Sequence, residues 1–120
     1  MYKISKEFAF SAAHALFGLG PDHPCTRLHG HNYIVRVHLR AEELSEKGFV
    51  RDYNDLKLVK HYIDNNLDHR NLNDIMSPLN SSAENLAKML FDIFKPMLPE
   101  LYAVEVSETP KTSAIYEPEG

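Results

Sequence analysis

Two long stretches of alternating apolar and polar residues place the strongest constraint on how this chain folds. Successive side chains of a strand point to opposite faces, so such alternation predicts a strand that is buried on one face only. Residues 2–14 and 31–41 both follow this pattern. The apolar positions that share a face are Tyr2, Ile4, Phe8, Phe10 and Ala12 in the first stretch, and Tyr33, Val35, Val37 and Leu39 in the second.

The rest of the chain supplies helices and two further strands. Residues 18–26 are rich in Gly and Pro, which favours a loop. Apolar residues at helical spacing predict helices over about 55–66 and 83–94, and Ser81 with Glu84 resembles a capping box before the second. Residues 101–109 and 113–117 read as strands. The order ββααββ predicts a single α+β domain over residues 1–120, with a four-stranded antiparallel sheet and two helices on one face.

Composition excludes several classes of protein. The formal net charge of −4 argues against a globally basic nucleic-acid binder, so no nucleic-acid partner is expected. One cysteine among 120 residues allows no intrachain disulfide and favours a reducing compartment. No apolar run approaches the roughly 20 residues that a membrane helix needs. We therefore predict a cytoplasmic protein with no membrane partner.

Three histidines fall on one face of the two long strands. His29 and His31 are two residues apart, so they project together, and His14 shares the parity of Phe8 and Phe10. Three imidazoles with an open fourth position are a known arrangement for catalytic zinc. The alternative is that His14 is a core histidine and that the His-Gly-His sequence is only the polar start of a strand.

Cys25 lies four residues before His29 and allows two kinds of site. As a fourth ligand it would complete a closed, structural zinc site with the three histidines. As a free thiol beside the metal it would be a base able to accept a proton. The spacing alone is compatible with both sites.

Two acidic positions suggest further chemistry. Asp68 precedes His69 directly, and an Asp that holds a His in one tautomer is a common way to prepare an imidazole for proton transfer. The same pair would also suit a simple helix C-terminus. Glu108 continues the inward parity of Tyr102, Val104 and Val106, where a carboxylate needs a partner or a ligand. If the strand ends one residue earlier, Glu108 is only a solvated loop charge.

Six segments together resemble the 6-pyruvoyl-tetrahydropterin synthase family. They are FAFSAAHAL, CTRLHGHNY, FVRDYNDLK, LDHRNLN, NSSAENLAK and VEVSET, and they span almost the whole chain. Ser82 stands where a threonine is common in the family. The resemblance implies the tunnelling fold, in which trimers pair sheet edges into a closed β-barrel and two trimers stack into a homohexamer. Closing a barrel removes the exposed edges of a small sheet.

The resemblance also implies roles for the candidate site residues. It implies a zinc site made by His14, His29 and His31. Cys25 would then be a catalytic thiol and not a ligand, and Asp68 with His69 would form a proton relay. Glu108 would anchor a pterin ring.

The substrate implied by the resemblance is 7,8-dihydroneopterin triphosphate, acted on by a zinc-dependent lyase. The short C-x3-HGH spacing is most similar to the queuosine-pathway branch of the family, the 6-carboxy-5,6,7,8-tetrahydropterin synthases, which release acetaldehyde and triphosphate. The pyruvoyl branch, which keeps the side-chain carbons, remains an alternative, as does a binding protein with a closed zinc site. Arg27 and Lys111 are candidates for holding the triphosphate.

Overall fold

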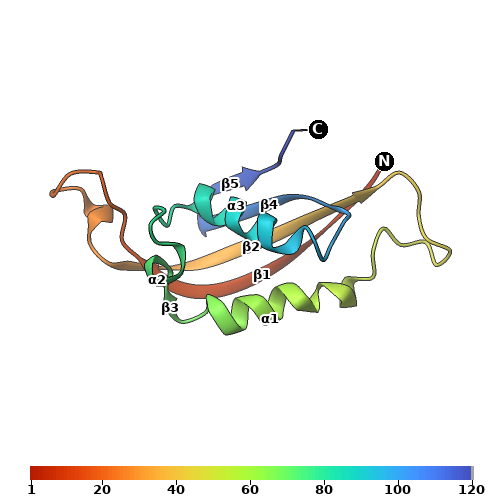
Figure 1. Cartoon of the computed structure of the whole chain (residues 1–120), viewed down its shortest axis with the longest axis horizontal. Coiled ribbons are helices and arrows are strands. Elements are labelled where there is room, and N and C mark those ends of the chain that lie inside the picture. The colour runs from red at the N-terminus through yellow and green to blue at the C-terminus, as the bar shows by residue number, and fades with distance from the viewer. Residues whose placement is uncertain (120) are drawn as a thin grey trace.

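A five-stranded mixed sheet forms the frame of the molecule (Figure 1). The computed structural model describes residues 1–119, and the strand order across its sheet is β3-β1-β2-β4-β5. The strands are β1 (Tyr2–His14), β2 (His29–Ala41), β3 (Arg70–Asn71), β4 (Leu101–Thr109) and β5 (Thr112–Tyr116).

The two long strands pair along their whole length, as their alternation predicts. Antiparallel pairing of β1 with β2 runs without interruption from Tyr2 opposite Ala41 to His14 opposite His29. Because no bulge breaks this register, every second residue of each strand keeps the same face. The histidines therefore stay on the face that carries Tyr33 and the valines of β2.

The helices cover that same face of the sheet. They are α1 (Lys57–Asn66), which follows the short 3₁₀ turn η2 (Tyr53–Leu56), then α2 (Leu72–Met76) and α3 (Ala83–Phe94). A second 3₁₀ turn, η1 (Pro24–Thr26), lies in the Gly- and Pro-rich loop between β1 and β2. None of the helices in residues 1–119 has the length and apolar character needed to cross a membrane.

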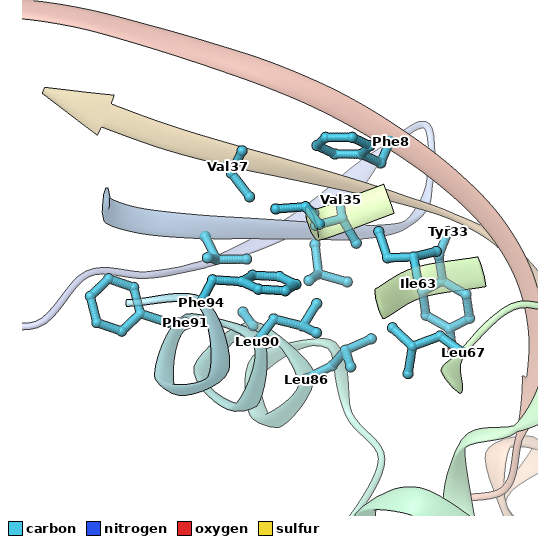
Figure 2. Packing of buried hydrophobic residues seen from close by; sticks show 14 of the residues in the cluster. Phe8, Tyr33, Val35, Val37, Ile63, Leu67, Leu86, Leu90, Phe91 and Phe94 are labelled. Atoms are coloured by element: carbon cyan, nitrogen blue, oxygen red, sulfur yellow. The ribbon is translucent and has the colours of Figure 1, made fainter. Parts of the chain in front are cut away.

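The core lies between the sheet and the helices α1 and α3 (Figure 2). Ile63 of α1 and Leu90 of α3 are almost or completely inaccessible to solvent and pack toward Val35 of β2. Truncating a buried leucine to alanine typically costs about 2–5 kcal/mol, because transfer free energy is lost and a cavity remains. The core therefore fixes the face of the sheet on which the site is built.

The prediction of a four-stranded antiparallel sheet is wrong in one respect. β3 adds a fifth strand, which pairs parallel to β1 through Arg70 opposite Ala12 and Asn71 opposite Ala13. Two residues are too few to show a period of two, so no sequence pattern could identify this strand. The short helix α2 was not predicted either, because its five residues are too few to establish a helical period.

Two local predictions are also corrected. Ser82, and not Ser81, caps α3, since its Oγ accepts a hydrogen bond from the backbone N–H of Asn85 at 3.2 Å. Tyr102 does not share the inward face of Val104, because the β2–β4 register shifts beside Leu39 and leaves Tyr102 as an extra residue. Its ring lies over Arg40 on the helix-free face.

Candidate active site

The three histidines predicted to share a face converge at one end of the sheet. One ligand atom from each of His14, His29 and His31 lies within 4.8 Å of the other two. Their ring centroids are 4.6–5.0 Å apart, and the rings meet edge to face. The pairing of His14 opposite His29 brings together two residues that are 15 positions apart in the sequence. This geometry confirms the prediction that the three side chains form one cluster.

Backbone carbonyl groups orient two of these rings. Nδ1 of His14 lies 2.7 Å from the carbonyl oxygen of Ser81, and Nδ1 of His29 lies 2.8 Å from that of Arg27. A carbonyl only accepts hydrogen bonds, so each Nδ1 carries the proton and each Nε2 keeps a free lone pair. Metal-binding histidines are commonly held by this kind of outer contact.

The unpaired nitrogens of the cluster fit a metal ion. His14 is fully buried, and within the described chain its Nε2 has no hydrogen-bond partner, nor has the buried Nε2 of His31. Burial lowers the pKa of His31, opposed by the charge of Glu108 and helped by the two neighbouring histidines. The neutral imidazole that a metal requires is therefore favoured. Three imidazole nitrogens suit zinc, and their number leaves a fourth position open.

Glu108 lies beside this cluster, as its inward parity predicts. Its Oε2 is 3.5 Å from Nε2 of His31, which is an electrostatic contact and too long for a well-formed hydrogen bond. β4 continues to Thr109, so Glu108 is part of the strand and not a loop charge. Burial, together with the charge of Glu108, raises the pKa of Tyr33, whose hydroxyl is also buried without a partner in the described chain.

Cys25 occupies the loop beside the cluster. It lies in η1 and is partly buried, and its carbonyl oxygen accepts a hydrogen bond from the N–H of Leu16, two residues after His14. The backbone N–H of Cys25 donates to Nδ1 of His23. Among residues 1–119, the group whose donor atoms could hold a metal consists of the three histidines without Cys25.

Asp68 and His69 form a hydrogen-bonded pair at the edge of β1 that faces away from β2. Oδ2 of Asp68 lies 3.0 Å from Nδ1 of His69, and Oδ1 accepts from the N–H of Ser11. These two contacts, with the Ser11 N–H the stronger, lower the pKa of Asp68. The His69 side chain is 82% exposed and its φ is +59°, in the left-handed region that few residues other than glycine adopt. The pair is thus fixed at its carboxylate end and open to solvent at its imidazole.

A hollow of about 540 Å³ has one residue from each of these two groups in its lining. It is lined by His31 of the cluster and His69 of the pair, with Gly30, Asn32 and Arg70 among the other lining residues. An added Cβ at Gly30 would meet only the backbone oxygen of Ala12, at 3.6 Å, which is an ordinary contact. Of the two candidate triphosphate-binding residues, Lys111 lines a second hollow together with Glu108, and the carbonyl of Arg27 accepts from His29.

The groups that support the site could not be identified from the sequence. The capping-box pattern predicts Ser81 as a helix cap, but Ser81 is buried and its carbonyl orients His14. A backbone carbonyl has no signature in a sequence, because every residue carries one. The side chain of Asn73, which binds the backbone of Ala15, lies in a motif that carries the family resemblance and could have been flagged for that reason alone.

Three histidines with a free coordination position are one of the ligand sets found in catalytic metal sites, and the comparisons with known proteins give the family. The family model described as 6-pyruvoyl tetrahydropterin synthase matches residues 3–119 of this chain. A relative from Synechocystis sp., named 6-carboxy-5,6,7,8-tetrahydropterin synthase, is 38% identical, and the alignment covers 97% of this chain and 93% of the relative. The human 6-pyruvoyl tetrahydrobiopterin synthase is 32% identical over 98% of this chain and 86% of its own length.

Solved structures agree with the sequence relatives. The structure of Caenorhabditis elegans 6-pyruvoyl tetrahydropterin synthase superimposes with a TM-score of 0.86 at 30% identity, covering 98% of this chain and 96% of that one. The chain belongs to the 6-pyruvoyl tetrahydropterin synthase family.

Proposed function

We propose that this protein is a zinc-dependent 6-carboxy-5,6,7,8-tetrahydropterin synthase. It would convert 7,8-dihydroneopterin triphosphate to 6-carboxytetrahydropterin, acetaldehyde and triphosphate, as a cytoplasmic lyase of queuosine biosynthesis. The observation that carries the proposal is the cluster of His14, His29 and His31 in a chain of this family. The short C-x3-HGH spacing and the name of the Synechocystis relative favour the carboxy product.

The three histidines would hold the zinc through ring nitrogens: the Nε2 atoms that the backbone contacts of His14 and His29 leave free, and the buried, unpartnered Nε2 of His31. When bound, zinc supplies a Lewis acid that makes protons next to a coordinated hydroxyl group easier to remove. With three protein ligands, the metal would keep a fourth position available to the substrate. The burial that lowers the pKa of His31 supports this assignment, because it keeps that ring neutral.

Proton transfer would be shared by Cys25 and the Asp68–His69 pair. Cys25 lies outside the metal-binding group, which supports a role as an acid or base in preference to a ligand. In the pair, Asp68 accepts from His69 Nδ1 and so leaves Nε2 to exchange protons with substrate or solvent. The two groups lie on different elements and would act on opposite sides of the substrate.

Glu108 would anchor the pterin ring. Its carboxylate accepts hydrogen bonds only, and a pterin offers a ring N–H and an exocyclic amine as neighbouring donors. The position of Glu108 beside His31 would set the bound pterin next to the metal.

The assembly we propose is a homohexamer built from two trimers. The side of β1 that faces away from β2 pairs with β3 only at Ala12 and Ala13, so most of this 13-residue strand presents an open edge. β5 forms the opposite edge of the sheet. Open edges of this length favour pairing with other chains, and closure into a barrel would satisfy both.

A second candidate is the pyruvoyl activity of the same family. It is favoured by the human and C. elegans relatives, whose names give 6-pyruvoyl synthases. Both activities would use the same metal and proton-transfer residues, so the products separate them.

Incubation of the zinc-loaded protein with 7,8-dihydroneopterin triphosphate tests the proposal. We expect release of triphosphate and a 6-carboxy pterin. A 6-pyruvoyl product would establish the second candidate, and no consumption of the substrate by the zinc-loaded hexamer would refute both.

A further inference from the structure

The segment that joins the metal cluster to the Cys25 loop is held by side chains in place of a neighbouring strand. β1 ends at His14, and β3 covers its outer edge only at Ala12 and Ala13. Beyond that point, residues 15–17 continue in the same direction. Their backbone groups must still find partners, because the segment lies against α2 and the turn before α3 (Figure 1).

Asn73 of α2 provides the first of these partners. Its Oδ1 accepts from the N–H of Ala15 at 2.8 Å, and its Nδ2 donates to the carbonyl oxygen of the same residue, also at 2.8 Å. Asn73 is half-buried, and α2 follows β3 directly in the chain. One side-chain amide thus replaces the strand partner of the residue next to His14.

Asn80 repeats this arrangement two residues further on. Its Oδ1 accepts from the N–H of Phe17 at 3.1 Å, and its Nδ2 donates to the Phe17 carbonyl oxygen at 3.0 Å. The carbonyl of Asn80 in turn accepts from the side chain of Asn85 in α3 at 2.9 Å, which ties the turn to a helix of the core.

The backbone N–H of Leu16, between Ala15 and Phe17, points to the opposite side of the segment. It donates to the carbonyl oxygen of Cys25 at 2.8 Å. Alternate residues of an extended segment direct their backbone groups to opposite sides, so holding Ala15 and Phe17 on one side fixes the direction of Leu16 on the other. The place of Cys25 relative to His14 therefore depends on the two asparagine side chains.

We propose that Asn73 and Asn80 are positioning residues, which hold the Cys25 loop and the metal ligand His14 in a fixed mutual geometry. Their relevance to turnover rests on the proposed function. Only a carboxamide offers a donor and an acceptor in one plane, as a peptide group does. An aspartate of the same shape cannot donate, and it would place a carboxylate oxygen against a carbonyl oxygen.

The test compares Asn73→Asp and Asn80→Asp with Asn65→Asp. Asn65 lies exposed on α1, so it matches the change in charge without touching the segment. Two measurements need no pterin: the rate at which iodoacetamide alkylates Cys25 in the zinc-loaded protein, and zinc affinity by competition with a chelator. Circular dichroism checks whether each variant is folded. If Asn73→Asp does not fold, the test is made with Asn80→Asp only.

We expect the alkylation rate to change by about 5-fold or more in both variants, since each substitution removes a hydrogen bond worth about 1 kcal/mol and sets a carboxylate oxygen against a carbonyl oxygen. Zinc affinity should fall in Asn73→Asp, whose partner adjoins His14. For the active enzyme, kcat should fall while KM stays within about threefold of the control, because the pterin anchor is untouched.

An alkylation rate within twofold of Asn65→Asp in either variant overturns the role of that asparagine. Unchanged zinc affinity in Asn73→Asp overturns its link to His14. If the wild-type protein does not act on the pterin while these two readouts still shift, the proposed function fails and the positioning role stands.

Discussion

Zinc should raise the thermal stability of this protein, and the gain can be worked from the site. Without metal, His14 and His31 each carry a buried Nε2 that has no partner in the described chain. A buried unsatisfied polar atom costs about 1–3 kcal/mol, and metal coordination removes that cost at both positions. A ligand that binds only the folded chain adds about 2.7 kcal/mol when its free concentration is 100 times Kd.

For a chain of this length, 1 kcal/mol corresponds to about 4 °C in Tm, so saturating zinc should raise Tm by about 10 °C. The effect should shrink as pH falls below about 6.5, where protons compete for imidazole nitrogens. The depressed pKa of His31 delays the protonation of that ring as the pH falls.

Thermal melts of metal-free protein with and without zinc measure this directly. His29→Ala should abolish the increase, whereas His61→Ala, an exposed histidine on α1, should preserve it. The reasoning is refuted if zinc leaves the wild-type Tm unchanged, or if His29→Ala is stabilised as much as the wild type.

Four further results are expected. Cys25→Ala should retain zinc by metal analysis and lose most turnover; loss of zinc would make Cys25 a ligand. Glu108→Gln should weaken substrate binding about 5- to 150-fold by calorimetry with zinc content unchanged, because an amide donor would face the donors of the pterin; equal affinity would exclude the anchoring role. The lowered pKa of Asp68 stabilises the folded protein above about pH 4, and this stability is lost as the pH falls through the pKa of the folded state. The unfolding free energy of Asp68→Asn should therefore depend less steeply on pH in acid than that of the wild type. An identical acid dependence would disprove this. Sedimentation should give a hexamer, and an active monomer would contradict the proposed assembly.

The sequence predicted the parts of the fold that repeat over many residues. The alternation in β1 and β2 and the helical spacing in α3 gave elements whose bounds the structure matches within two residues. It also brought the three histidines to one face, since strand parity is a property of a continuous register. Long, periodic segments carry enough apolar positions to define their own geometry.

What the sequence did not predict depends on single contacts. β3 has two residues, and the irregularity that turns Tyr102 to the helix-free face involves one. The Asn73 and Asn80 side chains pair with backbone atoms nearly 60 positions or more away, and no local pattern records such a partner. These contacts could not be predicted because they join residues that are far apart in the sequence. One partner in each is a backbone group, which every residue possesses.

The ratio of acetaldehyde to triphosphate released from 7,8-dihydroneopterin triphosphate tests the central claim most directly. Both products can be measured in one reaction with the zinc-loaded protein, and the metal-free protein serves as the control. A 6-carboxytetrahydropterin synthase releases one acetaldehyde for each triphosphate. Triphosphate without acetaldehyde would contradict the proposed activity.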